Sequence, residues 1–229
     1  MTKLSRPLQK KPIRETIYND LRKQILSGRF LPGSRLVESS LAKNLKVSRT
    51  VIREVIKQLE GEGLVKITPY KGTEVSNFSL EDIRDLYCIQ AALEGLAAGL
   101  ATQRITRKEI GKLRQIQRQL CKAAQKDATE WQRLNVQFHH FFLKQSGNER
   151  LQGLAKNLRD QFARYWWIIL SIPGQRERNI KAHENILEAL KEGDSAQVRL
   201  AMEEHIRKAS ESLTDFLAKH NLIRTRNFL

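Results

Sequence analysis

RLVESSLAKNLKVSRTVIREVIKQLEGEGLVKITPYKG, residues 35–72, is the stretch that decides the fold of the first third of this chain. Within it, apolar residues recur at helical spacing in two runs, 41–45 and 52–59. Residues 46–48 leave room only for a tight turn between the two helices. Ser48 can accept a hydrogen bond from a backbone N–H at a helix start, so the second helix begins there. Two short β-branched segments follow, 64–68 and 73–76, with the turn residues Pro69 and Gly72 between them. The pattern predicts a winged helix-turn-helix.

The second of these helices carries, at its first turn, side chains that are suited to contact DNA. Arg49, Thr50 and Arg53 lie near its start, while the apolar residues of 52–59 take the inner face. Arg pairs bidentately with guanine, Thr reaches a phosphate or a thymine methyl, and a helix N-terminus favours an anion. The alternative is that Arg49 and Arg53 form an ordinary solvated basic face. The turn before the helix and the wing after it favour the DNA-binding interpretation.

This segment resembles the DNA-binding domain of the GntR family of bacterial transcription regulators. The matching residues are 31–38, 41–42, 47–50, 52–54, 58–60 and 62–72. The resemblance implies that the operator is contacted by Arg35, Ser48, Arg49, Thr50 and Arg53, with Lys71 and Gly72 at the wing tip. It also implies that the protein is a transcription regulator, more commonly a repressor.

Charge and composition agree with a nucleic-acid partner. The 229 residues carry a net charge of +16, and residues 1–78 hold 16 Lys and Arg against 7 Asp and Glu. A basic N-terminal third suits a polyanion.

We expect a flexible basic arm over 1–12, a DNA-binding domain over 13–78, a helical domain over 79–219 and a tail over 220–229. Cys88 and Cys121 are expected to be buried free thiols, and the protein is expected to be cytoplasmic with no membrane span.

Residues 79–219 predict a helical bundle. The turn signals thin out and strand-like alternation stops after Phe78. Six amphipathic helices are expected, over 79–102, 106–126, 129–146, 149–171, 175–193 and 195–219. The fold class is therefore mainly α, a winged helix-turn-helix followed by an antiparallel all-helical bundle.

Three histidines lie on the apolar faces of different predicted helices: His139, His183 and His205. A single histidine on such a face is usually a core residue with a hydrogen-bond partner. Three that point into one bundle indicate a shared metal, because each buried neutral imidazole needs a partner. Asn135, one turn before His139, adds an oxygen to the same face, and His140 is expected to point outward.

The bundle is similar to the FCD ligand-binding domain of the FadR subgroup of GntR regulators. The similarity rests on Leu93–Glu94, Ala97–Ala98, Phe138–His139 and residues 146–148. It implies a divalent metal, Zn, Ni or Mn, on Asn135, His139, His183 and His205. Asn135 stands where the family usually has aspartate, which weakens the site because an amide oxygen is the poorer ligand.

The resemblance also implies a small-molecule effector, for which an organic acid is the candidate. Gln90 occupies a position where the family commonly has an arginine that pairs with the effector carboxylate. Arg133, Arg159 or Arg164 could replace that arginine. Tyr165 or Trp166 could line the effector cavity, although packing in the core or at a dimer interface explains the aromatic cluster at 162–167 as well.

Two classes of function follow. The first is a ligand-responsive regulator that binds a palindromic operator as a homodimer. The second is a metal-dependent enzyme in which the three histidines activate water. No acidic residue is placed by an evident motif to act as a general base, and the basic wing has no role in an enzyme. The regulator is therefore the leading hypothesis.

Overall fold

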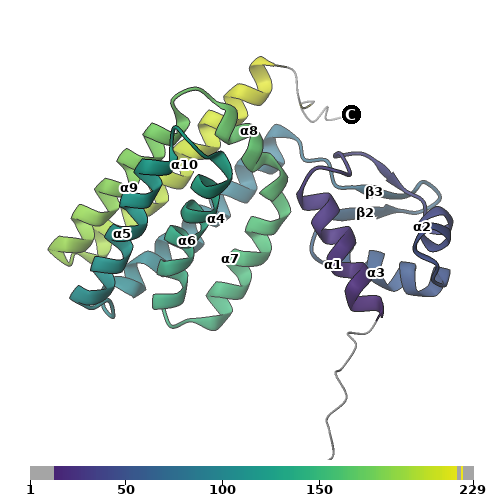
Figure 1. The fold of residues 1–229 in the computed structure, drawn as a ribbon, viewed down its shortest axis with the longest axis horizontal. Helices are drawn as coiled ribbons and strands as arrows, with labels where there is room; N and C mark the ends of the chain where they lie inside the picture. The colour runs from purple at the N-terminus through teal and green to yellow at the C-terminus, as the bar shows by residue number, and fades with distance from the viewer. Residues whose placement is uncertain (1–12, 221–222, 224–229) are drawn as a thin grey trace, which may run out of the picture. The chain divides into compact units, whose positions relative to one another are not determined.

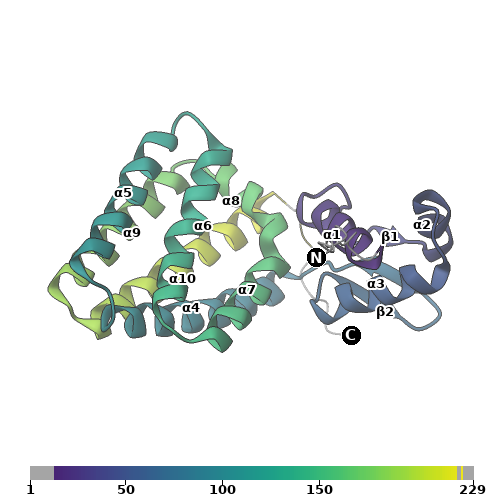
Figure 2. The ribbon, with the colours of Figure 1, turned by 60° about the horizontal axis from the view of Figure 1, so that its bottom comes forward.

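The computed structural model describes residues 13–220 and 223, except for the side chains of Phe162, Arg164 and Trp167. The chain divides into two compact units, Met1–Asn77 and Phe78–Leu229 (Figures 1 and 2). The expected basic arm, 1–12, and nearly all of the expected tail lie outside the described residues.

The N-terminal unit is a small three-helix domain with a three-stranded sheet. Its elements are α1 (Ile13–Leu26), β1 (Arg35–Leu36), α2 (Glu38–Leu45), α3 (Arg49–Gly61), β2 (Val65–Thr68) and β3 (Gly72–Val75). The strands are antiparallel in the order β1-β3-β2, with Val65 opposite Val75 and Arg35 opposite Glu74. The predicted winged helix-turn-helix is confirmed. The sequence pattern did not reveal β1, because two residues are too few to show alternation.

The tight turn between α2 and α3 has a local cause. Lys46 adopts the left-handed conformation with φ 54°, and its N–H caps α2. Ser48 then begins α3, since its side chain accepts a hydrogen bond from the Val51 N–H at 3.3 Å. Ile52, Val55, Ile56 and Leu59 are buried against α1, as the apolar spacing predicted. The opposite face of α3 is consequently left to the solvent.

The C-terminal unit is all helical. Its helices are α4 (Leu80–Thr102), α5 (Arg107–Ala123), α6 (Ala128–Gln145), α7 (Glu149–Phe162), α8 (Trp166–Ser171), α9 (Gln175–Glu192) and α10 (Ser195–Lys219). Side-chain caps fix several starts, including capping boxes at Ser79 and Thr106. The single helix expected over 149–171 is broken by a 3₁₀ turn at Ala163–Tyr165, which separates α7 from α8.

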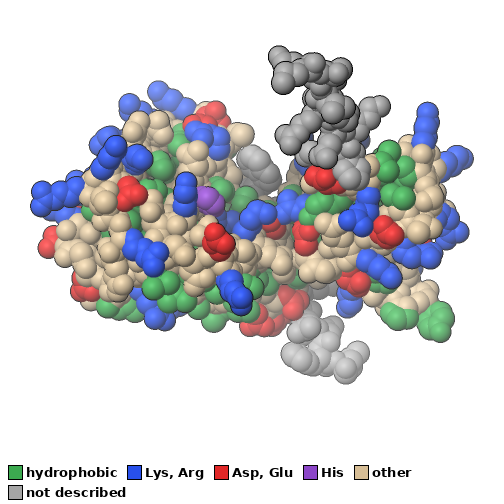
Figure 3. Space-filling model, turned by 90° about the horizontal axis from the view of Figure 1, so that it is seen from below, with side chains coloured by type: hydrophobic (Ala, Val, Ile, Leu, Met, Phe, Trp, Pro, Cys, Tyr) green, Lys and Arg blue, Asp and Glu red, His purple; other side chains and the backbone are tan. Residues whose placement is uncertain are grey.

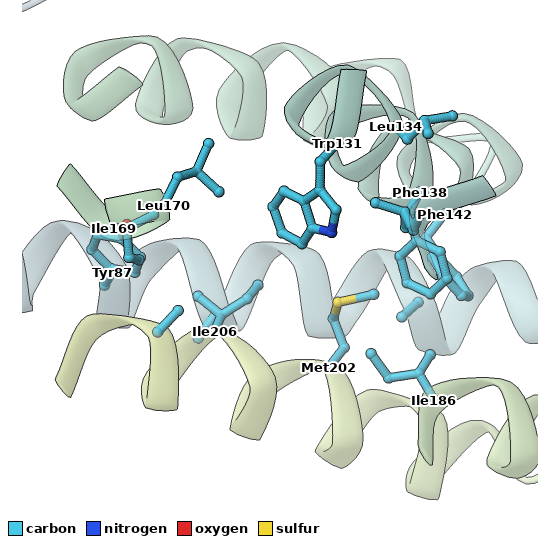
Figure 4. Packing of buried hydrophobic residues seen from close by; sticks show 14 of the residues in the cluster. Tyr87, Trp131, Leu134, Phe138, Phe142, Ile169, Leu170, Ile186, Met202 and Ile206 are labelled. Atoms are coloured by element: carbon cyan, nitrogen blue, oxygen red, sulfur yellow. The ribbon is translucent and has the colours of Figure 1, made fainter. Parts of the chain in front are cut away.

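The long helices α4 and α10 pack closely against each other (Figure 1). Their approach depends on Gly95, where an added Cβ would lie 2.4 Å from Cγ of Glu203. Around this pair lies a hydrophobic core built from every helix of the unit except α7, whose Leu151 and Ala155 are buried in a second, smaller cluster. Figure 4 shows the indole of Trp131 pointing from α6 toward Met202 and Ile206 of α10. Side chains of the bundle therefore converge between α4, α6 and α10.

Two further expectations can be compared with the fold. Cys88 and Cys121 are free, as expected, but both are exposed, so the expectation of buried thiols was wrong. Apolar neighbours in sequence misled it, because on a helix the adjacent residue points about 100° away. Across the described residues, no helix is both long and apolar enough to cross a membrane.

Candidate DNA-binding surface and metal centre

The first turn of α3 presents Arg49 and Thr50 to solvent. Ser48 is also exposed, but its Oγ is engaged as the helix cap. Arg49 makes no ion pair with any residue in the described part of the chain. Its guanidinium can therefore reach an external anion without first leaving an internal partner.

Arg53, one turn later, is held differently. Its Nη2 lies 3.0 Å from Oε2 of Glu38 on α2, and its side chain is 55% exposed. The hydrogen bond to Glu38, together with that residue's charge, raises the pKa of Arg53. A pair this exposed contributes little stability, so Arg53 can exchange Glu38 for a phosphate or a base at small cost.

The wing adds cations on the same side of the unit. Arg35, Arg49, Lys71 and Gly72 line one surface hollow of about 250 Å³. The structure thus brings together residues from β1, α3 and the β2–β3 hairpin that are far apart in sequence. Lys and Arg side chains are spread over the surface of both units in the view of Figure 3, so the position of these four residues is more informative than the total charge.

The three histidines predicted to share a metal converge in the helical unit. His139 comes from α6, His183 from α9 and His205 from α10, and all three are buried. The Nε2 atom of His205 lies 3.2 Å from Nε2 of His183 and 3.3 Å from Nε2 of His139. One ligand atom from each residue falls within 4.8 Å of the others, a spacing at which the three could share a single metal ion.

A carboxylate orients the first of these ligands. Nδ1 of His139 donates to Oε2 of Glu94 at 2.6 Å, and Nε2 of the same ring lies 3.3 Å from Nε2 of His205. Metal-binding histidines are commonly fixed in this way, because a carboxylate on one ring nitrogen sets the tautomer of the other. Glu94 is in turn paired with Arg159 of α7 and receives the amide of Gln90.

The protonation states suit a cation. Burial, with nearby His139, lowers the pKa of His205 to about 3. Burial and the two neighbouring rings lower the pKa of His183 well below its usual value. Burial would raise the pKa of Glu94, but Arg159 and His139 outweigh it and hold that pKa well below the normal range. His183 and His205 are therefore neutral imidazoles, the form that binds metals.

Asn135 supplies a separate indication that a cation binds at the histidines. Its Oδ1 is buried and has no hydrogen-bond partner within the described residues, although its side chain lines the cavity next to His139. Buried polar atoms are rarely left unpaired. A cation on the three histidines would give this oxygen a partner, so the residues present fit a divalent metal.

A cavity of about 70 Å³ adjoins the histidines. It is lined by residues of six helices: Tyr87, Gln90, Glu94, Trp131, Gln132, Asn135, Val136, His139, Arg159, Trp166, Ile169, Asn179, His205, Ile206 and Ala209. Its volume is below the roughly 300 Å³ at which sites for drug-sized ligands begin. The cavity therefore suits a small ligand beside the histidine centre.

Of the four residues expected to bind the effector, two line the cavity and two do not. Gln90 and Trp166 line the cavity. Arg133 lies outside it on the exposed side of α6, where Glu130 holds its guanidinium at 2.6 Å. Tyr165 is buried against the core and is not a lining residue. The guanidinium at the cavity belongs to Arg159, which the sequence offered only as one of three candidates.

Glu94 is the functional residue that sequence reasoning missed. It was recognised as part of a matching motif but was given no role. The available signal was an acidic residue within a nearly apolar helix segment, LEGLAAGLA, at 93–101. Such a residue is seldom buried unless it is paired.

The chain matches two family models. Residues 13–75 match the model of bacterial regulatory proteins of the gntR family, and residues 85–208 match the FCD domain. The chain is 31% identical over 204 residues to YdhC, an HTH-type transcriptional regulator of Bacillus subtilis, covering 87% of this chain and 90% of that protein. It is 27% identical over 203 residues to RspR, an HTH-type transcriptional repressor of Escherichia coli, with 88% and 89% covered.

Solved structures show the same fold. E. coli McbR/YncC superposes with a TM-score of 0.71 at 23% identity, over 90% of this chain and 99% of that one. A putative GntR regulator from Rhodococcus gives 0.65 at 20% identity, over 87% and 96%. At these identities the likeness concerns the fold and not the ligands.

Proposed function

Because this chain belongs to the GntR family of bacterial regulatory proteins and carries an FCD domain, we propose that it is a repressor that binds a palindromic operator as a homodimer. Its FCD unit would respond to a small effector. The family consists of transcription regulators, and the relatives matched along most of the chain are named as regulators or repressors. The metal-dependent enzyme that the histidines also suggested is therefore set aside.

The exposed first turn of α3 is the observation that carries the DNA-binding proposal. Arg49 and Thr50 face solvent at a capped helix N-terminus, and Arg35 and Lys71 flank the same hollow. In winged helix-turn-helix proteins the recognition helix enters the major groove with its N-terminal residues on base edges. The flanking cations would then hold phosphates and fix the register.

We expect Arg49→Ala to weaken operator binding by about 10- to 100-fold, because one bidentate base contact is worth roughly 1–3 kcal/mol. The operator can be selected from random-sequence duplexes with the wild-type protein, and affinity measured by fluorescence anisotropy. Arg118→Ala is the control, since Arg118 is an exposed arginine on α5 in the other unit. Equal affinity of the Arg49 variant and wild type would remove α3 from the interface.

The homodimer finds support in one face of α4. Ile89 is 52% exposed and Leu96 is 40% exposed, and their spacing of seven residues places them on the same side of the helix. Leu200 of α10, the helix packed beside α4, is 54% exposed. A second copy of this chain is the occupant proposed for this face, because a palindromic operator needs two heads related by a two-fold axis.

Leu96→Glu is expected to shift the protein from dimer to monomer, because it would bury a charge in a two-fold contact. The mass is measured by light scattering after gel filtration. Leu31→Glu, at a 65% exposed leucine of the other unit, is the matched control and should leave the mass unchanged. A dimer that survives Leu96→Glu together with Ile89→Glu would place the interface elsewhere.

The sensing function is proposed for the histidine centre and its cavity. His139, His183 and His205, with Asn135, would hold a divalent ion such as Zn, Ni or Mn. When bound, this ion supplies a Lewis-acidic position for an oxygen of an organic-acid effector. The effector would change operator affinity only by the difference between its affinities for the DNA-bound and free states.

A further inference from the structure

The amide of Gln90 is placed to read one functional group of the effector. The residue is 2% exposed, comes from the middle of α4 and lines the cavity. Its Nε2 donates to Oε1 of Glu94. Its Oε1 is buried and accepts no hydrogen bond from any residue in the described part of the chain.

The orientation of this amide is dictated by its neighbour. Oε1 of Glu94 receives the guanidinium of Arg159 and Oε2 receives the Nδ1–H of His139, so both oxygens of the carboxylate act as acceptors. Gln90 must therefore turn its NH₂ group toward Glu94, and its oxygen is left on the other side. A flipped amide would set two acceptors against each other.

A buried acceptor without a donor is costly, and such atoms usually mark a missing partner. Gln117 shows that an unpaired amide oxygen alone is not enough, because its Oε1 is also buried and unpartnered but it does not line the cavity. Gln90 differs because it lines a cavity that can admit the missing donor.

Other cavity groups present the opposite polarity. The indole Nε1–H of Trp131 is a buried donor without a partner in the described residues, and Trp131 lines the cavity at 1% exposure. The guanidinium of Arg159 has five N–H groups, more than Glu94 can occupy. The cavity is therefore complementary to a ligand that carries two kinds of group. One is a hydrogen-bond acceptor, preferably anionic, for Trp131 and Arg159, and the other is a hydrogen-bond donor for Gln90.

We propose that Gln90 selects a small carboxylic acid that carries a hydroxyl or amino group, and discriminates against the same acid without it. The inference rests on the effector-binding function proposed above and specifies its ligand class. An arginine at this position would hold a second carboxylate, whereas the amide oxygen repels a carboxylate and accepts from O–H or N–H. The volume of about 70 Å³ restricts the class to small acids.

The experiment compares acids that differ by one group. Lactate is compared with propionate, malate with succinate, and alanine with propionate, by calorimetric titration of the full-length chain with and without added Zn²⁺. The wild type should bind at least one substituted acid about fivefold or more tightly than its unsubstituted partner, since an unfilled buried acceptor penalises the latter.

Variants assign this preference to Gln90. Gln90→Met keeps the side-chain length but removes the acceptor, and the preference should disappear. Gln117→Met makes the same change at a buried glutamine outside the cavity and should leave the preference intact. Gln90→Arg should favour succinate over propionate, because an arginine at this position would hold the second carboxylate.

The proposal is overturned if the wild type binds both members of every pair equally, if it binds none of the acids, or if Gln90→Met keeps the preference. Operator binding is measured on the same protein preparations, so that a failure of the proposed ligand class can be distinguished from a failure of the proposed regulatory function. A protein that binds its operator but shows no such preference loses only the ligand class. A protein that binds no DNA contradicts the function itself.

Discussion

Glu94→Gln is expected to lower the free energy of unfolding of the helical unit by about 3–5 kcal/mol, the cost of leaving a buried charge without its partner. The side chains of Glu94 and Arg159 are only 4% and 11% exposed. The substitution keeps the shape and removes the charge, so the guanidinium of Arg159 and the Nδ1–H of His139 would both lose a carboxylate. Urea unfolding monitored by circular dichroism measures the loss.

The chain contains a matched control for this change. Glu130 and Arg133 form an ion pair of the same chemical type, but their side chains are 41% and 53% exposed. Glu130→Gln should therefore destabilise the unit far less than Glu94→Gln does. The double substitution Glu94→Gln, Arg159→Met should recover part of the loss, because it removes the orphaned charge as well. If Glu94→Gln and Glu130→Gln lowered the free energy of unfolding equally, the ion pairs of Glu94 would not behave as buried ones.

Zn²⁺ in excess is expected to stabilise the wild-type protein strongly and the His183→Ala variant not at all. A ligand at 100 times its dissociation constant adds about 2.7 kcal/mol of stability when it binds only the folded state. His183 is fully buried and supplies one of three converging nitrogens, so its removal leaves an incomplete site. Thermal unfolding with and without Zn²⁺ measures the effect, and metal analysis after dialysis provides a readout that does not depend on stability.

His140 provides the control, since it follows a proposed ligand in sequence but is exposed, as expected from the helical period. His140→Ala should keep the full response to Zn²⁺. Asn135→Asp should bind the ion more tightly than wild type, because a carboxylate oxygen is a better ligand than an amide oxygen. Retention of Zn²⁺ by His183→Ala at the wild-type level would leave the three rings as core packing.

Local signals explain why so much of the fold could be predicted. Ser48 caps α3 through its own side chain, and the apolar residues of α3 repeat with the helical period over its whole length. The proposed DNA-binding surface follows from the same information, because residues that are not on the buried face of α3 face solvent. Grouping His139, His183 and His205 required only that three apolar helix faces meet in one core.

What could not be predicted depends on contacts between distant helices. Sequence spacing gave no reason to choose Arg159 over Arg133, because the difference is that α7 packs against α4 while Arg133 is held by Glu130 on its own helix. The break at Ala163–Tyr165 contains neither proline nor glycine, so no local signal marked it. The role of Glu94 likewise requires knowing that three helices bring their polar groups to it.

Helix α4 begins close to the wing in the sequence and runs without a break to the cavity. Only four residues, 76–79, separate the last strand of the wing from its first turn, and the same uninterrupted helix carries Gln90 and Glu94 into the cavity. From Gln90 back to Leu80 is about 15 Å of helix, a length over which hydrogen-bonded backbone behaves as a stiff rod. A turn or slide imposed on Gln90 or Glu94 by an occupant of the cavity would therefore be carried along the helix to Leu80, its first residue.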